Sequence, residues 1–275
     1  MKIHSYINTD VFTVASTGDV VILEIIGNPL YPLIDLQAKA TLFDCLDEIN
    51  SRDDIRVMVI IGPAIKPDYQ EYVDLFRRNK GSYTDRRSQR TKGIGMYLVD
   101  HDTLARFCNA VNQFILKIVG FDKFVIHADS GPIISPFMNL SLSCDYRIVG
   151  EHSVYKNPYL GIGLVPKGGS AFFLKRLIGY RNARKVLLAD GIICADEALK
   201  LGIVDQVVSA TDLYDTALKI ARSYAELPAC SLSGIKKLMN CSTEELETCL
   251  KSEDEQFFRI ANSEKFRNTL IAPCS

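Results

Sequence analysis

The sequence predicts a layered α/β protein that continues into a purely helical region. In the first half, short runs rich in β-branched residues alternate with amphipathic helical segments, an order typical of a sheet with helices on both faces. After residue 208 only helical periodicity continues. At 275 residues, with 47% apolar and 24% charged side chains, the chain can bury a substantial core. We therefore expect an α/β body over residues 1–208 and a helical region over 209–275.

Two strands with a helix between them are predicted in the first 62 residues. Residues 20–26 and 57–62 are rich in Val and Ile and end at a glycine or a turn. Asp35 lies between these strands, and its side chain can accept a hydrogen bond from the first turn of a helix. We expect that helix to turn one apolar face to the core, formed by Leu36, Ala40, Phe43 and Leu46.

A second helix leads into a third strand at residues 124–128. Its apolar residues recur at steps of three and four, as on a helix with one buried face. They are Leu104, Phe107, Val111, Phe114, Ile115 and Ile118. These elements extend the alternation of strands and helices.

The C-terminal region is expected to contain at least two amphipathic helices. One spans residues 211–226 and ends before Pro228. Ser242 and Glu245 have the spacing of a capping box that opens another. The apolar stripe of this last helix is predicted to be Leu246, Leu250, Phe257 and Ile260.

Composition excludes several classes of protein. The net charge of −1 gives no global field that would attract nucleic acid or an anionic membrane, and no apolar run approaches the roughly 20 residues of a spanning helix. The N-terminus has neither a signal-peptide core nor an Arg-rich transit character, so we expect a cytoplasmic protein. The eight cysteines show no metal-site or disulfide spacing and are interpreted as buried apolar side chains.

Three segments carry a family resemblance: residues 131–148, 158–166 and 195–205. Their order of Gly-Pro, Cys-Asp-x-Arg-Ile, Pro-x-x-x-Leu-Gly and Gly-Ile-Val-Asp is similar to that of the crotonase superfamily, also called the enoyl-CoA hydratase/isomerase family. The resemblance covers about residues 10–270. It implies a crotonase-like ββα spiral whose C-terminal helical region builds trimers, or dimers of trimers.

In this family two backbone N–H groups bind the thioester carbonyl of an acyl-CoA and stabilise the oxyanion that develops there. The resemblance places one donor near Gln70 or Glu71. The other aligns with Pro136, and proline has no N–H group. Carbonyl activation at that position is therefore lost.

The family's hydratases also hold two glutamates around a water molecule, and these positions align with Asn139 and Tyr159. An amide cannot take up a proton at neutral pH, and a phenol is an acid rather than a ready base. Tyr159 could donate to an oxyanion or could simply fill the space of the glutamate. Asn139 could orient a substrate or could bond to the local helix, and Ser135 could replace the lost donor or could start a helix with Pro136.

Binding of coenzyme A is implied at several further positions. Pro32 and Leu33 occupy the slot that seats the adenosine end of CoA, Lys66 begins the oxyanion loop, and Phe266 aligns with a C-terminal aromatic residue near the ligand. The basic run over residues 77–92 is either a solvated loop or an attractor of the CoA phosphates.

Two other features allow two interpretations each. His127 and Asp129 share one face of a strand, where they form either a catalytic base with its orienting carboxylate or a satisfied polar pair in the core or at a subunit contact. The glycines of Gly168-Gly169-Ser170 either face an anion at a helix start or permit tight packing. Asp145 is expected to be structural.

The sequence therefore predicts a protein that acts on or binds an acyl-CoA thioester and is not an ordinary enoyl-CoA hydratase. One hypothesis is an enzyme, a lyase, isomerase or hydrolase of acyl-CoA with altered site chemistry. The alternative is a non-catalytic homologue that serves as a CoA-binding or assembly subunit. No cofactor is expected apart from the coenzyme A of the substrate or ligand.

Overall fold

A computed structural model of the chain describes residues 4–64, 66–67, 71–72, 101–188 and 192–266. Within these ranges seven strands form one sheet, in the order β1-β2-β3-β4-β5-β7-β10, and three short strands form a second, in the order β6-β8-β9. The large sheet contains β1 (His4–Asn8), β2 (Phe12–Thr17), β3 (Val20–Ile25), β4 (Val57–Ile61), β5 (Phe124–Asp129), β7 (Tyr146–Gly150) and β10 (Gln206–Val208). The small sheet contains β6 (Pro132–Ile134), β8 (Val154–Lys156) and β9 (Ile192–Cys194).

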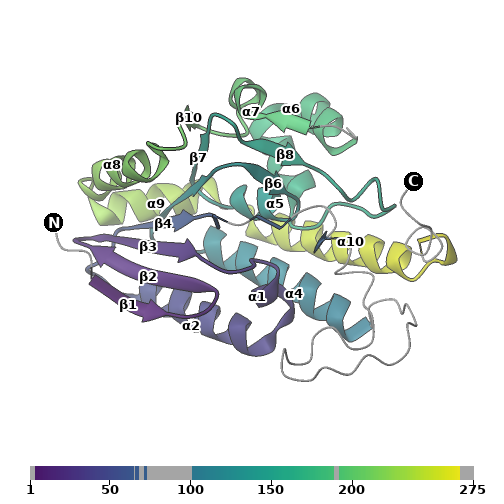
Figure 1. Ribbon diagram of the computed structural model, residues 1–275, viewed down its shortest axis with the longest axis horizontal. Coiled ribbons are helices and arrows are strands. Elements are labelled where there is room, and N and C mark those ends of the chain that lie inside the picture. The colour runs from purple at the N-terminus through teal and green to yellow at the C-terminus, as the bar shows by residue number, and fades with distance from the viewer. Residues whose placement is uncertain (1–3, 65, 68–70, 73–100, 189–191, 267–275) are drawn as a thin grey trace.

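The helices lie on both sides of the large sheet and beyond one edge of it (Figure 1). They are α1 (Tyr31–Ile34), α2 (Leu36–Ser51), α4 (His101–Val119), α5 (Phe137–Ser141), α6 (Ser170–Leu188), α7 (Ala195–Leu201), α8 (Leu213–Ala225), α9 (Ala229–Met239) and α10 (Thr243–Ala261). The predicted α/β class is confirmed. The two C-terminal helices that the sequence predicted correspond to α8 and α10, and α9 lies between them.

The direction of the strands determines where side chains can meet. β1, β2 and β3 pair antiparallel, whereas β3, β4, β5, β7 and β10 all run parallel. In the β4–β5 register, Ile60 lies opposite His127 and Ile61 opposite Ala128. Because parallel strands end at the same edge of a sheet, residues that follow β3, β4 and β5 come together there, where ligands commonly bind in such folds.

Each face of the large sheet is covered by different helices. On one face, β3 residues such as Val21 and Leu23 pack with Leu46 and Ile49 of α2 and with Ile118 of α4. On the other face the alternate strand residues pack against α8, in a cluster formed by Val20, Ile22, Val57, Val59, Ala217 and Ala221. The alternation of side chains along each strand therefore supplies both cores.

The C-terminal helices pack onto the body. α8 contacts β3, β4, β5 and β7, and α10 contacts α4 and α6 (Figure 1, yellow). The predicted stripe of α10 points inward, since Leu246, Leu250 and Phe257 are buried and Ile260 is half-buried. The division of the chain at residue 208 stays a prediction.

Two predicted details of the helix ends have different outcomes. Asp35 caps α2, accepting a hydrogen bond from the backbone N–H of Ala38 at 2.8 Å. Ser242 precedes α10 but makes no side-chain cap bond, and Glu245 instead pairs with Arg176, so the predicted capping box is wrong.

The predicted apolar face of α2 is also partly wrong. Leu36 is 58% exposed because it is the first residue of the helix and lies at the end of the packed face. Ala40 is exposed as well, and Phe43 is half-buried. The buried residues of α2 are Leu42, Cys45, Leu46 and Ile49.

The cysteines differ in burial. Cys45, Cys108 and Cys144 are buried, as expected, but Cys194, Cys230 and Cys241 are exposed, which corrects the expectation for these three. They lie on short β9 or near helix ends, where an apolar neighbourhood in the sequence does not imply a buried side chain.

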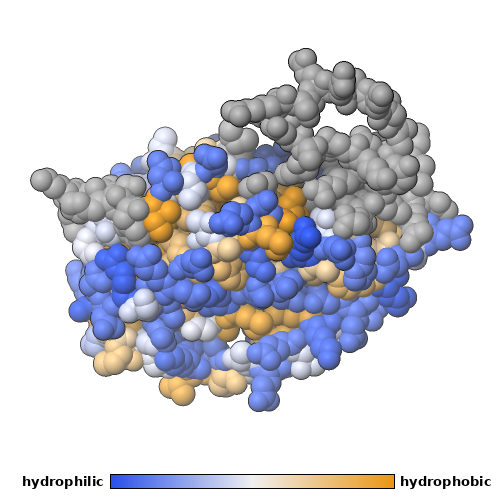
Figure 2. Space-filling model, turned by 90° about the horizontal axis from the view of Figure 1, so that it is seen from below, coloured by the Kyte–Doolittle hydropathy of each residue, from blue (hydrophilic) through white to orange (hydrophobic). Residues whose placement is uncertain are grey.

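None of the helices in the described ranges combines the length and the apolar character that crossing a bilayer requires. Figure 2 shows one face of the molecule, on which hydrophilic residues cover most of the surface and hydrophobic residues gather in small groups between them.

Candidate functional site

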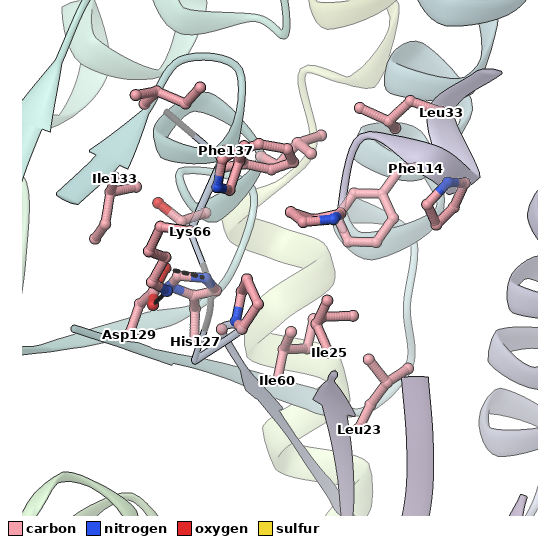
Figure 3. A pocket seen from close by; sticks show the side chains of 18 of the residues that line it. Leu23, Ile25, Leu33, Ile60, Lys66, Phe114, His127, Asp129, Ile133 and Phe137 are labelled. Carbon is pink, nitrogen blue, oxygen red and sulfur yellow. Dashed lines mark hydrogen bonds and ion pairs between the residues drawn. The ribbon is translucent and has the colours of Figure 1, made fainter. Parts of the chain in front are cut away.

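A mostly apolar cavity of about 100 Å³ lies beside the carboxyl ends of β3, β4 and β5 (Figure 3). The strand ends contribute part of its wall; α1, α2, α4, α5, β6 and the loop residues next to these elements contribute the rest. Its apolar side chains include Leu23, Ile25, Leu33, Ile60, Phe114, Ile133 and Phe137. The arrangement of parallel strands in this fold therefore places a cavity at the edge of the sheet where ligands commonly bind in such folds.

Three polar side chains gather on one side of this cavity: Lys66, His127 and Asp129, here called the polar corner (Figure 3). The ammonium of Lys66 contacts Oδ1 of Asp129 directly in an ion pair. The same oxygen accepts a hydrogen bond from the backbone N–H of Ser130 at 2.8 Å. The side chains of Lys66 and Asp129 are only 11% and 4% exposed, so this pair is largely removed from water.

A glycine makes room for the carboxylate of Asp129. Gly62 follows β4, and its N–H donates to the carbonyl of Ala128 at 2.8 Å. A Cβ atom at position 62 would overlap Cγ and both oxygens of Asp129. The close approach of Asp129 to the backbone therefore requires the absence of a side chain at this position.

His127 lies next to the ion pair without joining it by a hydrogen bond. Its Nε2 is 4.0 Å from Oδ2 of Asp129, and its buried Nδ1 has no partner among the described residues. Burial lowers the pKa of His127 to about 4, against the opposing effect of the Asp129 carboxylate. The positive charges of Lys66 and Arg147 contribute to this lowered pKa, of which burial is the largest cause. His127 is therefore neutral at pH 7, and Asp129 is satisfied by Lys66 and Ser130 rather than by the histidine.

Asn139 and Ser135 are brought together by the structure, but away from the cavity wall. Both are buried, and the amide nitrogen of Asn139 donates to Oγ of Ser135 and to the carbonyl of Lys167, each at 2.9 Å. These bonds tie α5 to the segment that precedes α6. Neither residue lines the cavity.

Tyr159 also lies outside the cavity lining. Its ring is buried in the core, and its hydroxyl donates to the carbonyl of Leu187 at 3.0 Å. Burial raises the pKa of Tyr159 above its usual value, and the Glu253 carboxylate raises it further. The phenol therefore stays protonated and has a structural partner within the chain.

Of the three residues assigned to the oxyanion loops, two can be located. Pro136 is buried at the start of α5, directly before Phe137 of the cavity wall. Glu71 is exposed. Gln70 lies outside the described residues.

Three of the four residues assigned to CoA binding line the cavity: Pro32, Leu33 and Lys66. Phe266 is buried in the core beyond α10 and does not line it. The basic run over residues 77–92 lies outside the described ranges.

A second polar network is buried between α4, α6 and α10. Oε2 of Glu253 accepts hydrogen bonds from the backbone N–H groups of Gly168 and Gly169, at 3.0 and 2.9 Å. Lys167 is fully buried, and its Nζ contacts Oδ1 of Asn112. The same Nζ lies 2.9 Å from Oδ1 of Asp254 and 3.8 Å from Oε2 of Glu253. The glycine pair therefore faces an anion, as one interpretation predicted, and the anion comes from the chain itself.

The glycine pair is required by the backbone as well. Gly168 and Gly169 have φ angles of 108° and 69°, in the left-handed region that favours glycine. A Cβ on Gly168 would also lie 3.1 Å from that of Asn139. The predicted tight packing and the predicted anion site are both present.

Asp145 has the structural role that the sequence predicted. One of its oxygens accepts from the backbone N–H of Val125 at 2.8 Å and from the ammonium of Lys236 at 2.7 Å. These contacts tie α9 to the sheet.

The grouping of the polar corner was not predicted from the sequence. Lys66 and Asp129 are 63 positions apart, and no local pattern links them. The available signal was a polar residue on the buried strand β5 together with a glycine at the end of the adjacent strand β4. Within the described ranges no three His, Cys, Asp or Glu side chains are grouped as a metal site would require.

Comparison with known proteins gives relatives over different parts of the chain. The chain is 31% identical over 151 residues to 4-chlorobenzoyl coenzyme A dehalogenase-1 of Arthrobacter sp, covering 54% of this chain and 53% of that protein. It is 28% identical over 162 residues to the short-chain-enoyl-CoA hydratase of Clostridium acetobutylicum, covering 58% and 62%. The chain thus spans little more than half the length of these curated relatives.

Solved structures agree with the fold over nearly the whole chain. The crystal structure of an enoyl-CoA hydratase from Bacillus halodurans superposes with a TM-score of 0.74 at 18% identity, covering 98% of both chains. A putative enoyl-CoA hydratase/isomerase from Acinetobacter baumannii gives 0.70 at 21% identity, covering 94% of this chain and 100% of the other. At this identity the likeness concerns the fold alone. The model of the enoyl-CoA hydratase/isomerase family matches residues 94–272, well over half of the sequence, and the chain therefore belongs to that family, the crotonase superfamily.

Proposed function

We propose that this protein binds an acyl-CoA thioester in the cavity at the ends of β3, β4 and β5, and that it is not an ordinary enoyl-CoA hydratase. The apolar cavity with a single polar corner carries this proposal, because an acyl thioester is an apolar chain with one polar carbonyl group. Pro32, Leu33 and Lys66 line the cavity, in agreement with their assignment to CoA contacts. The named relatives, a coenzyme A dehalogenase and an enoyl-CoA hydratase, support the ligand class.

The side chains at the two glutamate positions argue against hydration by a pair of carboxylates. The amide of Asn139 and the phenol of Tyr159 make hydrogen bonds to Lys167 and Leu187, outside the cavity lining. A positioned acid or base contributes roughly 10²–10⁴-fold to a rate, or about 3–5 kcal/mol. Loss of both groups and of the amide donor at Pro136 removes most of a hydratase's advantage.

Within this proposal we favour an enzyme class with altered chemistry, namely a lyase, isomerase or hydrolase of acyl-CoA. The polar corner supports it, because a largely buried lysine, a buried carboxylate and a neutral imidazole in one pocket are groups that catalysis uses. We further propose self-association as a trimer or hexamer and a cytoplasmic location, as the family resemblance implies.

One observation favours the alternative, a non-catalytic CoA-binding or assembly subunit. Ser135, Asn139 and Tyr159 all engage in hydrogen bonds within the protein, as residues with structural roles do.

Calorimetric titration with CoA and with acyl-CoAs of increasing chain length tests the proposed ligand. We expect micromolar to millimolar binding that strengthens with the acyl chain, because the cavity wall is apolar. An assay of crotonyl-CoA hydration, followed by loss of the enoyl absorbance, tests the proposed loss of that reaction. Rapid hydration by the pure protein would refute the second half of the proposal, and failure to bind any CoA compound would refute the first.

A panel of acyl-CoAs incubated with the protein and analysed by mass spectrometry separates the enzyme from the binding subunit. Conversion of any member supports the enzyme class, whereas binding with no conversion supports the subunit.

A further inference from the structure

We infer that the ammonium of Lys66 is the hydrogen-bond donor that holds the carbonyl oxygen of the bound thioester, with Asp129 as its positioning residue. This inference rests on the proposed function, since it concerns where the thioester group lies in the same cavity. It assigns to a side chain the task that a backbone N–H cannot perform at Pro136.

The cavity wall is poor in backbone donors. Five of the residues that line it are prolines, none of which has an N–H group: Pro29, Pro32, Pro63, Pro67 and Pro132. Gly62 also lines the cavity, but its N–H is already bonded to Ala128. These positions offer no N–H group to a carbonyl oxygen that enters this space, which gives weight to a side-chain donor.

Among the described lining residues, the side chains leave one strong donor. The hydroxyl of Ser141 donates to the carbonyl of Met138 at 2.6 Å. Cys144 is a weak donor as a thiol, and burial raises its pKa to about 12. His127 is neutral and has a single N–H. Lys66 has three N–H donors, of which Asp129 takes one.

The location of Lys66 suits this role. It follows β4, in the segment where the family resemblance places an oxyanion donor, and it shares the cavity with Phe137, the residue directly after Pro136. Lys66 therefore lines the same cavity as the residue that follows the missing N–H.

Asp129 gives Lys66 a fixed direction and a matched charge. The carboxylate accepts a hydrogen bond from the N–H of Ser130 and packs closely against Gly62. These two contacts fix the position of the oxygen that pairs with Lys66. With His127 neutral, the polar corner has no net charge. Such a corner accepts a neutral carbonyl group at lower desolvation cost than an additional anion.

The experiment compares two ligands that differ only in the carbonyl group: butyryl-CoA and its thioether analogue, butyl-CoA. Calorimetry with the wild-type protein is expected to give about 10- to 100-fold tighter binding of the thioester, the range for a hydrogen bond from a charged donor. In Lys66→Met the protein should lose its preference for the thioester, so that the ratio of the affinities for butyryl-CoA and butyl-CoA falls to about one. Affinity for the thioether should change by less than about threefold, because methionine keeps the apolar stem.

Two further variants keep the test decisive. Lys66→Met leaves a buried unpaired carboxylate, so Lys66→Met/Asp129→Asn removes the charge as well and preserves the shape of the corner; the ratio should again be about one. Asp129→Asn alone should lower the ratio while thioether affinity is retained, which a purely structural role for Asp129 would not do. Lys200→Met on the exposed surface of α7 is the matched control and should keep the wild-type ratio.

The outcomes separate the two proposals. Binding of both ligands with a ratio that does not depend on Lys66 would overturn the carbonyl assignment and leave the CoA-binding function intact. Failure of every CoA compound to bind would overturn both.

Discussion

The carboxylate of Asp129 fills the space that a side chain at position 62 would need. Gly62 directly follows β4 and Asp129 is the last residue of β5, and the two strands are adjacent and parallel. The same carboxylate forms the ion pair with Lys66 while it lies against the glycine backbone. The geometry of the polar corner therefore depends on a residue with no side chain.

Gly62→Ala should destabilise the protein by about 1–3 kcal/mol, the usual cost of overpacking a buried contact. It should also weaken acyl-CoA binding, because Asp129 must move and Lys66 with it. Urea unfolding and calorimetry measure the two effects. Gly234→Ala on α9 is the control: nothing lies within 4 Å of its added Cβ, and it should be neutral or stabilising by up to about 1 kcal/mol. Equal changes in stability and in acyl-CoA affinity for Gly62→Ala and Gly234→Ala would contradict the close contact between Gly62 and Asp129.

Tyr159→Phe should lower stability by about 1–2 kcal/mol without changing acyl-CoA affinity or turnover. The reason is that its hydroxyl donates to the carbonyl of the half-buried Leu187, which would be left without this donor. Chemical denaturation and calorimetry are the measurements, and Tyr180→Phe, at a ring that is 70% exposed, is the control. A loss of turnover at unchanged stability would instead support the catalytic role that the sequence suggested for this phenol.

Asn139→Asp should destabilise the protein by about 2–4 kcal/mol at pH 7 and should not create hydratase activity. The isosteric carboxylate cannot donate to Ser135 or to the carbonyl of Lys167, and its charge would be buried. Burial would raise the folded-state pKa of the new carboxyl group, so the penalty should shrink as the pH falls and the group is protonated. A variant as stable as the wild type at pH 7 would show that these hydrogen bonds contribute little to the free energy of unfolding.

His127 should make the protein less stable in acid. Its pKa of about 4 in the folded state lies below the value of roughly 6.5 for an unfolded chain, so the unfolded state takes up the proton first. The contribution to stability is fully present above pH 6.5 and is lost as the pH falls toward 4. Between pH 7 and pH 5 we expect a loss of about 2 kcal/mol from this residue.

The comparison of the wild type with His127→Gln isolates this effect, because other titrating groups, such as Glu253, are common to both proteins. The variant should show a shallower decrease of unfolding free energy over that pH interval. Parallel pH profiles for the two proteins would mean that His127 is not buried in its neutral form.

Glu253→Ala should cost about 2–4 kcal/mol and loosen the packing of α10 on α6. It removes the acceptor of the Gly168 and Gly169 N–H groups and leaves Lys167 with fewer counter-charges. Hydrogen exchange at the start of α6 should increase. Glu255→Ala, on the exposed side of the same helix, should stay within about 0.5 kcal/mol of the wild type.

Much of the fold could be predicted because its signals are local. The strands at Val20 and Val57, the Asp35 cap and the apolar face of α4 are each visible in fewer than twenty consecutive residues. β6, β8 and β9 could not be predicted, since three residues are too few to show a period of two. The hairpin of β1 and β2 was missed as well, because its sequence mixes Thr, Ser and Ala with few large apolar residues.

The site was less predictable than the fold because its contacts are remote in the sequence. Lys66, Gly62 and Asp129 were each visible as unusual residues, but only the β4–β5 register brings them together. Glu253 gave no signal at all, since an acidic residue in an amphipathic helix normally faces solvent. The interpretation of Asn139 and Tyr159 as substituted glutamate positions stays a prediction. Their hydrogen-bond partners could not be predicted, because they lie on segments near Lys167 and Leu187 that are remote in the sequence.

The carboxylate of Glu253 gives the start of α6 a resident occupant. Any external phosphate or carboxylate that approaches Gly168 and Gly169 has to compete with a rival tethered to the same chain, whose effective concentration is on the order of millimolar or more. Weakly binding anions therefore do not displace Glu253 from these N–H groups. The start of α6 is thus closed to external anions, whereas the cavity beside Lys66 is left for a ligand.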